Sequence, residues 1–457
     1  MQEAFLDTVA LVIQQINTFI WGWPIILFFI GVGLMATFAL NFVQVRYFLK
    51  AWRLVFSPRE QERTAGADMS PFQAFLNALS TSIGNGSLAG MATAIHQGGP
   101  GAAFWIFVLG FFALPIRFSE VYLSNAFEGA GSTIATGGPM LYLKKVPGGF
   151  ILPAFYAFFC LMLSFTSGNA VQANSISTGL QTILPAPSIV FALIIAAFVA
   201  YVVFGGAQRI IKISERIVPI KVGLFFISAL LLFFYNITAL GQALHIIITS
   251  AFTPQAVKGA LIGTSLQTAL RFGMSRSLNA TEVGLGTAAV FFGSTGAKNP
   301  VDNGIMSMVS AFISNYLVCF VLCLLIVLTG AWTNPTATGI PLVTQAFETL
   351  FGSLACWLVT TLSIIFGIGV LVAYAYIGRE CWNYLTGGRF TILYFILYCA
   401  LAFAGSLAKV QIVWDAVDIV NAGLMVINLY AIAVLMPKIR AAVRDYGQAP
   451  VRSNVHL

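Results

Sequence analysis

A short polar run, GNGSLAG at residues 84–90, interrupts a stretch that is otherwise apolar enough to span a membrane. Glycine, asparagine and serine favour unwinding, which leaves backbone groups without intrahelical partners. Such groups are intolerable facing lipid, but they suit a polar ligand inside the protein. Amides at Leu88, Ala89 and Gly90 can receive a carboxylate, and carbonyls around residues 82–84 can coordinate a cation. The alternative is that these small residues serve close helix packing.

A second interruption, RFGMSRSLNATEVGLGTA, covers residues 271–288. Asn279 followed by Glu282 fits a capping box, which would begin the second half-helix there. Glu282 is alternatively a proton carrier or an ion ligand, because an intramembrane carboxylate is costly and usually functional. Arg271 and Arg276 flank the same break, where they either pair with Glu282 or line a water-filled vestibule.

A third polar stretch, SGNAVQANSIS, covers residues 167–177. Asn169, Gln172 and Ser175 repeat every three residues and therefore share one helix face. In a membrane this face must point into the protein. It either contacts a ligand or forms hydrogen bonds between helices.

The composition shows that lipid is the solvent of this chain. Of its 457 residues, 59% are hydrophobic and only 8% are charged, and the mean hydropathy is +0.90. The apolar runs are twenty-odd residues long, as for membrane-spanning helices and not for the strands of a barrel. We therefore expect an all-α integral membrane protein.

A window of about twenty residues predicts eleven membrane spans. They lie at residues 19–45, 72–97, 101–125, 150–176, 188–206, 216–237, 259–295 (interrupted), 301–330, 348–376, 391–407 and 412–436.

The two interrupted helices are the second and seventh spans, five apart. Since five is odd, they cross the membrane in opposite directions. We therefore expect two inverted repeats, spans 2–6 and 7–11, with their binding site between the broken helices at the midplane. The corresponding units are an extra N-terminal helix with a basic cytoplasmic loop (1–69), repeat 1 (70–240), repeat 2 (241–437) and a cytoplasmic tail (438–457).

Basic residues divide unequally between the two sides of this topology. Nineteen fall on one side and two, Lys258 and Lys409, on the other. The positive-inside rule then places the N-terminus outside and the C-terminus in the cytoplasm, in the cell inner (plasma) membrane. The net charge of +8 thus reflects topology, and we expect no nucleic-acid binding. The nineteen are Arg46, Lys50, Arg53, Arg59, Arg63, Arg117, Lys144, Lys145, Arg209, Lys212, Arg216, Lys221, Lys298, Arg379, Arg389, Lys438, Arg440, Arg444 and Arg452.

Several stretches resemble the alanine or glycine:cation symporters. The segment GNGSLAGMATAIHQGGPGAAFW is similar to their signature, and the resemblance continues through RFSEVYL, GNAVQANS, EVGLG, PLVTQAF and GRECWNYL. It covers nearly the whole chain. The resemblance implies a LeuT-like fold and sodium-driven uptake of a small amino acid, with Gly84, Ser87 and Gln172 lining the substrate pocket.

The chain also departs from this pattern. Asn85 and Ser87 replace a threonine and an asparagine, and Ala280 to Val283 replace part of an SNEAGLG motif. In the ninth span, Gly369 and Val370 stand where these symporters carry serine and threonine. We therefore expect a sodium site near Ile83 and Gly369 to be weakened or absent. The cation is then held by other ligands, or a proton carried by Glu282 replaces it.

The sequence thus predicts a secondary active transporter that imports a small neutral amino acid together with sodium or a proton. It predicts no cofactor and leaves the oligomeric state open. A channel or a membrane-embedded enzyme is the alternative, although no Walker motif, His/Cys cluster or pore-loop repeat supports it. The expected substrate-binding residues are Gly84, Asn85, Gly86, Ser87, Gly90, Gln172, Ser175, Ser277, Asn279, Thr281 and Tyr374. The expected ion or coupling residues are Ser82, Ile83, Gly84 and Glu282.

Overall fold

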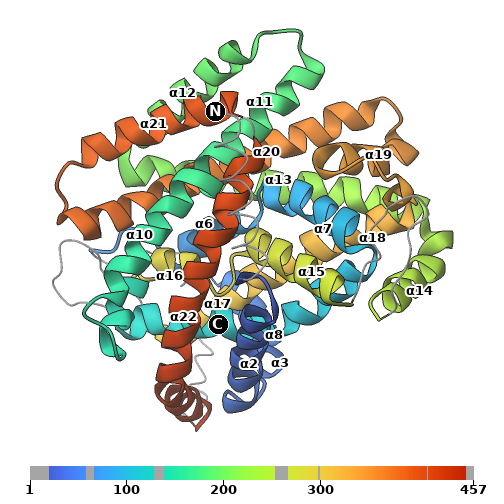
Figure 1. Cartoon of the computed structure of the whole chain (residues 1–457). Coiled ribbons are helices and arrows are strands. Elements are labelled where there is room, and N and C mark those ends of the chain that lie inside the picture. The colour runs from blue at the N-terminus through green and yellow to red at the C-terminus, as the bar shows by residue number, and fades with distance from the viewer. Residues whose placement is uncertain are drawn as a thin grey trace, which may run out of the picture.

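The chain is helical throughout the part that the structure describes, which contains no β-strand (Figure 1). This confirms the predicted all-α class. The structure is a computed structural model, and it describes residues 20–57, 66–127, 138–252, 266–296, 299–408 and 410–448.

Helices lie over all of the predicted spans. Most spans are single helices: α2 (Trp23–Ala39), α8 (Gly101–Ala126), α12 (Ser188–Val203), α13 (Gly206–Tyr235), α20 (Leu354–Thr386), α21 (Thr391–Leu407) and α22 (Val410–Gln448). Two spans contain π-helical turns: α10 (Leu152–Phe165) with η3 (Thr166–Ala170) and α11 (Val171–Ile183), and α17 (Pro300–Phe312) with η5 (Ile313–Phe320) and α18 (Val321–Leu328). The two remaining spans are broken helices.

Short helices that the span analysis did not predict connect these elements. They are α3 (Val43–Arg46), α4 (Phe48–Val55), α9 (Pro139–Tyr142), η2 (Leu143–Lys145), η4 (Ile237–Ala239), α14 (Leu240–Ser250), η6 (Ala331–Thr333) and α19 (Gly339–Phe351).

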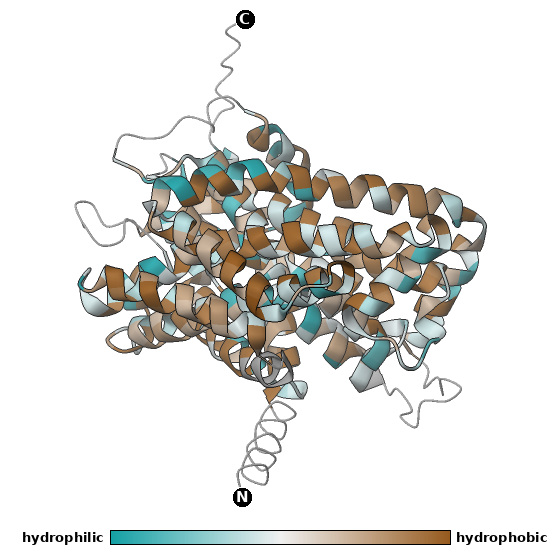
Figure 2. Ribbon diagram, turned by 90° about the horizontal axis from the view of Figure 1, so that it is seen from above, coloured by the Kyte–Doolittle hydropathy of each residue, from teal (hydrophilic) through white to brown (hydrophobic). Residues whose placement is uncertain are grey.

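The outer helices present apolar side chains to their surroundings. Leu193 and Ile194 on α12, Ile227 on α13 and Ile392 on α21 are each more than half exposed. Figure 2 shows hydrophobic residues over most of the ribbon, including its periphery. Six helices of the described chain are long and apolar enough to cross a membrane: 101–126, 152–183, 206–235, 300–328, 354–386 and 417–448. The protein is therefore a multi-pass membrane protein.

The helix α20 lies at the centre of one half of the molecule, where it packs against α6, α10, α11 and α13. The helix α8 packs along α17 in the other half, and both broken helices contact these elements (Figure 1). The broken helices are thus enclosed by other helices, where unwound backbone is tolerated.

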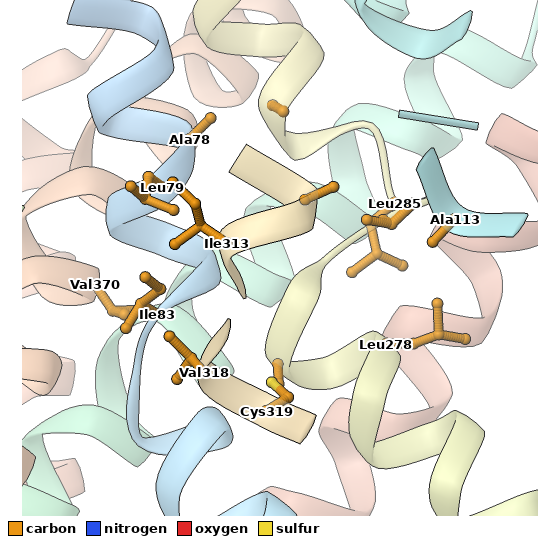
Figure 3. Packing of buried hydrophobic residues seen from close by; sticks show 14 of the residues in the cluster. Ala78, Leu79, Ile83, Ala113, Leu278, Leu285, Ile313, Val318, Cys319 and Val370 are labelled. Atoms are coloured by element: carbon orange, nitrogen blue, oxygen red, sulfur yellow. The ribbon is translucent and has the colours of Figure 1, made fainter. Parts of the chain in front are cut away.

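The first broken helix consists of α6 (Pro71–Ser82), η1 (Gly86–Gly90) and α7 (Met91–Gly98). A capping box between Ser70 and Gln73, with Pro71 at the first helical position, begins α6. The helix leaves its regular path at Ile83, where φ is −120° and ψ is 86°. The unwound part is therefore residues 83 and 84, beside Ile83 in Figure 3, and residues 86–90 are π-helical.

The second broken helix consists of α15 (Leu266–Thr281) and α16 (Thr287–Phe292). Glu282, Gly284 and Gly286 all have positive φ, of 57°, 85° and 79°. The predicted capping box is therefore wrong, because Asn279 lies in the last turn of α15 and α16 begins after Gly286. The left-handed conformation at Glu282 ends α15, and its carboxylate binds other groups.

Two basic side chains that were counted with the cytoplasmic loops lie inside the protein. Arg117 on α8 and Lys221 on α13 are both fully buried. The loop count was wrong at these positions, because each lies in the interior of a long helix. Arg59, Arg63, Lys258, Lys298, Lys409 and Arg452 lie outside the described residues.

Candidate functional site

A hydrogen-bonded cluster joins the first break to α11 and α20. The side-chain oxygen of Gln172 accepts from the backbone amide of Asn85 at 3.2 Å and from its Nδ2 at 3.1 Å. Ser363 Oγ donates to Asn85 Oδ1 at 2.7 Å. All three residues are buried. The structure thus brings Gln172, predicted from its helix face, directly to the break.

The backbone at the first break is closely packed. A Cβ atom built on Gly84 would lie 2.5 Å from Cγ2 of Val370, which lies beside the unwound chain at Ile83 (Figure 3). A Cβ atom on Gly168 would lie 2.2 Å from the ring of Tyr374. A side chain at either position would therefore force Val370 or Tyr374 to shift, so α20 packs closely against the backbone of the break and of η3.

Ser82 and Ser87, the serines on either side of the first break, donate their hydroxyl groups to carbonyls of the same broken helix. The carbonyl of Ser82 accepts from Ser314 Oγ at 2.6 Å and from Ser87 Oγ at 3.2 Å. Both serines that flank the break are fully buried. The Ser82 carbonyl, a predicted ion ligand, is thus already hydrogen-bonded by two hydroxyl groups.

Carbonyl oxygens at the end of α6 accept hydrogen bonds from Lys221, which the sequence analysis had not identified as a site residue. Lys221 Nζ donates to the carbonyl oxygens of Ser80 and Ile83, both at 2.7 Å. Ser80 Oγ donates to the carbonyl of Gly369 at 2.9 Å. The ammonium group of Lys221 therefore lies near Ile83 and Gly369, at the sodium site that was expected to be weakened or absent.

At the second break, Glu282 accepts hydrogen bonds on both carboxylate oxygens. Tyr374 donates to Oε1 at 2.6 Å, and Thr287 donates to Oε2 at 2.9 Å. Glu282 thus connects α20 to the start of α16. Tyr374 was predicted to bind the substrate, and in this structure its hydroxyl donates a hydrogen bond to Glu282.

A buried ion pair holds both ends of the second break. Arg117 pairs with Glu120 at 2.9 Å and donates to the carbonyl of Thr281 at 2.7 Å. Glu120 accepts from the amide of Gly286 at 3.2 Å and from Asn428 at 3.0 Å. The positive end of α16 therefore already faces a carboxylate of the protein.

The two breaks lie next to each other. A Cβ atom built on Gly86 would lie 3.4 Å from the carbonyl oxygen of Asn279. The side chain of Asn279, however, donates to Asp418 on α22 at 2.7 Å and also bonds Asn421. Arg276 pairs with the same aspartate at 3.5 Å. Asn279 therefore approaches the site through its backbone, while its side chain binds α22.

Three further predicted residues, Ser175, Ser277 and Thr281, make their described hydrogen bonds elsewhere. Ser175 and Thr281 donate to carbonyls of their own helices, at 2.9 and 2.8 Å. Ser277 donates to Asn315 at 2.9 Å. A Cβ atom on Gly90 would have no neighbour within 4 Å, so that glycine is not required by packing. None of these contacts joins the cluster around Asn85.

Several residues of the site were missed from the sequence. Lys221 stands alone in the apolar run VPIKVGLFF, and a lone lysine within a predicted span is itself a signal of a functional interior position. Arg117 and Glu120 are charged residues within a predicted span, three residues apart on one helix, so they too could have been recognised as functional interior positions. Ser363 carried none, because its partner Asn85 is distant in sequence.

Comparison with known proteins gives a consistent result. Residues 6–454 match the model of the sodium:alanine symporter family. The chain is 32% identical over 444 residues to an uncharacterised transporter of Haemophilus influenzae, covering 96% of this chain and 97% of that one. It is 31% identical to the sodium/alanine symporter of Methanococcus maripaludis, over 98% and 99% of the two chains.

More distant similarities were also found. A probable sodium/glutamine symporter of Bacillus subtilis is 29% identical, over 94% of this chain and 89% of that one. The manganese transporter of Eremococcus coleocola aligns in structure with a TM-score of 0.47 and 13% identity, over 81% of this chain and 77% of that one. The family model and the first two relatives, each spanning nearly the whole length, decide the assignment: the chain belongs to the sodium:alanine symporter family, a family of transporters and not of enzymes.

Proposed function

We propose that this protein is a secondary active transporter that imports a small neutral amino acid, such as alanine or glycine, together with a cation. It would do so by alternating access in the cell inner membrane. Membership of a symporter family supports this, and so does a polar, enclosed break in a membrane helix. The driving cation of the proposal is sodium or a proton.

The proposed architecture is a LeuT-like pair of inverted repeats, spans 2–6 and 7–11, with α2 as an extra helix. A short helix follows the second span of each repeat, α9 in the first and α19 in the second. The helix α19 packs on η1 and α7 of the first broken helix. Pro139, the first residue of α9, lies beside Gly286 of the second break. This matching placement supports the repeat.

The substrate carboxylate would bind at the start of the helix that runs from η1 into α7. No side chain caps this start, because the side chain of Asn85 is bound to Gln172 and Ser363. The positive end of this helix favours an anion there. The equivalent end of α16 is already paired with Glu120, so we assign the carboxylate to the first break alone.

The substrate ammonium would bind the carbonyls of the break and the side-chain oxygen of Gln172. That oxygen faces the break, where it accepts two hydrogen bonds from Asn85. Because an amide oxygen has two lone pairs, the ammonium group would take the place of the Asn85 side-chain donor. An ammonium group has three donors and no acceptor, which suits a site rich in carbonyl oxygens. Gln172 and Asn85 are thus the residues on which the proposed recognition depends.

The tight packing around the break is the observation that carries the choice of a small substrate. Val370 and Tyr374 lie so close to Gly84 and Gly168 that even one added methyl group would collide. A larger side chain on the substrate would need these residues to move. Alanine or glycine would fit with the least rearrangement.

Uptake of labelled alanine and glycine into proteoliposomes tests the proposal. We expect uptake of at least one of them, driven by a sodium gradient or a pH gradient. Glutamine is the comparison substrate, because one relative is named a probable sodium/glutamine symporter. Uptake of glutamine with no transport or exchange of either small amino acid would contradict the proposed substrate class.

A further inference from the structure

We propose that the side chain of Lys221 is the resident cation of the site between α6 and α20, and that it takes the place of a bound sodium ion there. The inference rests on the proposed function, since it concerns which cation that transporter uses. It extends the expectation, from the sequence, that a sodium site near Ile83 and Gly369 is weakened or absent.

The ammonium group is bound as a metal cation would be. Lys221 Nζ lies 2.7 Å from the carbonyl oxygens of both Ser80 and Ile83. These carbonyls end α6, where the helix dipole is negative and favours a positive charge. A cation at this point satisfies carbonyls that the unwound chain leaves without intrahelical partners. Lys221 thus supplies from α13 the charge that a free ion would otherwise bring.

The opposite wall of the site, formed by Gly369 and Val370 on α20, offers no side-chain oxygen to a sodium ion. A Cβ atom built on Gly369 would lie 2.8 Å from Lys221 Nζ and 3.1 Å from Ser80 Oγ. Glycine at this position therefore leaves the space that the lysine ammonium group occupies. Val370, the next residue, carries no side-chain oxygen. The lysine and the glycine form one complementary pair.

The surroundings of Lys221 suit a cation held inside the protein. Lys221 is fully buried, and its Nζ lies 5.9 Å from the ring centre of Phe366 on α20. A buried charge is costly unless it is hydrogen-bonded. The carbonyl oxygens of Ser80 and Ile83 supply those hydrogen bonds, and the ring of Phe366 adds a cation–π contact.

The main experiment is equilibrium binding of labelled sodium (²²Na⁺) and labelled alanine to purified protein, at constant pH. The proteins compared are the unmodified chain, Lys221→Met, the pair Gly369→Ser with Val370→Thr, and the triple variant Lys221→Ala with both of those changes. Lys212→Met is the matched control, because Lys212 is an exposed lysine on the same helix.

We expect the triple variant to bind one more sodium ion per chain than the unmodified protein, and to bind alanine more tightly in sodium than in choline. Lys221→Met should weaken alanine binding about tenfold or more, because two buried carbonyls lose their donor. The pair that keeps Lys221 should gain no sodium ion. Equal sodium binding by all variants, or the same gain in the pair that keeps Lys221, would overturn the proposal.

A second measurement does not depend on the triple variant folding. Gly369→Ala adds one methyl group against Lys221 Nζ, whereas Gly223→Ala on α13 adds one where no atom lies within 4 Å. Alanine binding should fall in the first and persist in the second. In the background of Lys221→Met, the effect of Gly369→Ala should shrink, since the two residues act as a pair. Fully additive effects would contradict the inference.

These outcomes separate the two proposals. If the unmodified protein neither binds nor exchanges alanine or glycine, the proposed function fails. The ²²Na⁺ comparison between the unmodified chain and the triple variant would still decide the role of Lys221, because it needs no substrate.

Discussion

The hydroxyl of Tyr374 donates a 2.6 Å hydrogen bond to Oε1 of Glu282, and this bond joins the middle of α20 to the second break. The ring of Tyr374 packs against Gly168 in η3 at the same time. Tyr374 therefore connects three elements: α20, the break before α16, and the π-helical turn between α10 and α11. A movement of α16 would therefore be transmitted to α20 and η3 through the side chain of Tyr374.

Removing this hydroxyl should slow transport. Tyr374→Phe leaves Oε1 of Glu282 without its donor, and hydrogen bonds to charged groups contribute about 1.5–3 kcal/mol. We expect a loss of alanine exchange of about tenfold or more. The control is Tyr398→Phe, which removes a buried hydroxyl that donates to the carbonyl of Leu371 at 2.9 Å. If both variants exchange alanine equally well, the bond to Glu282 has no part in transport.

Gln172→Ala should weaken amino-acid binding by about 1–3 kcal/mol, because the amide and side chain of Asn85 lose their common acceptor. Gln172→Leu should behave similarly, since leucine fills space without accepting a hydrogen bond. Alanine affinity in detergent measures the effect. Gln181→Ala, at the exposed end of the same helix, is the control. Unchanged affinity in both Gln172 variants would make this face a packing surface only.

Breaking the buried ion pair should destabilise the protein strongly. Arg117→Met leaves Glu120 buried without its ion-pair partner, and loss of one partner of such a pair costs about 3–5 kcal/mol. The double change Arg117→Met with Glu120→Gln should recover part of this loss. Arg444→Ala, which breaks an exposed pair with Asp445, should cost about 0–1 kcal/mol. Thermal unfolding in detergent compares the three; equal losses would show that burial of the pair does not matter.

The positions of the helices could largely be predicted from the sequence, and the contacts of the site only in part. The length of an apolar run follows membrane thickness, so helix is found within each predicted span over the residues that the structure describes. Gln172 was found because a polar helix face in a membrane must point inward. Its hydrogen bonds could not be inferred, since its partner Asn85 is 87 residues away and Ser363, which donates to Asn85, is 278 residues from Asn85.

The errors have a common physical cause. Lys221 and Arg117 were assigned to loops because basic residues normally mark the cytoplasmic side of a membrane. Each instead donates a hydrogen bond to a carbonyl at the end of a half-helix: Lys221 to Ile83, and Arg117 to Thr281. A rule based on counting charges does not detect a cation whose partner is an unwound backbone. The left-handed turn at Glu282 was missed for a similar reason, since its carboxylate is bound by tertiary contacts.

The proposed orientation places the loop after α4 in the cytoplasm and the loop before α19 outside. In a variant without native cysteines, Ser57→Cys should react with a membrane-impermeant thiol reagent only from the cytoplasmic side. Thr336→Cys, at an exposed position, should react only from outside. The excess of basic residues on the first side is the physical reason. The reverse labelling pattern would contradict both the orientation and the inverted repeat built on it.

Gly84→Ala tests whether the close packing of the first break is needed for function. The added methyl group would lie 2.5 Å from Val370 Cγ2, so either α20 or the unwound chain must shift. Overpacking of this kind costs about 1–3 kcal/mol. We expect alanine binding to fall about tenfold, while Gly31→Ala on α2, where no atom lies within 4 Å, keeps it.

A compensating change makes this prediction specific. Val370→Ala removes Cγ2, so the double variant Gly84→Ala with Val370→Ala should regain most of the alanine affinity that Gly84→Ala loses. Recovery would show that the contact between Gly84 and Val370 sets the spacing of α6 and α20 at the site. If the double variant binds alanine no better than Gly84→Ala alone, the glycine is needed for its backbone conformation or for direct contact with the substrate, and the packing argument for a small substrate is wrong.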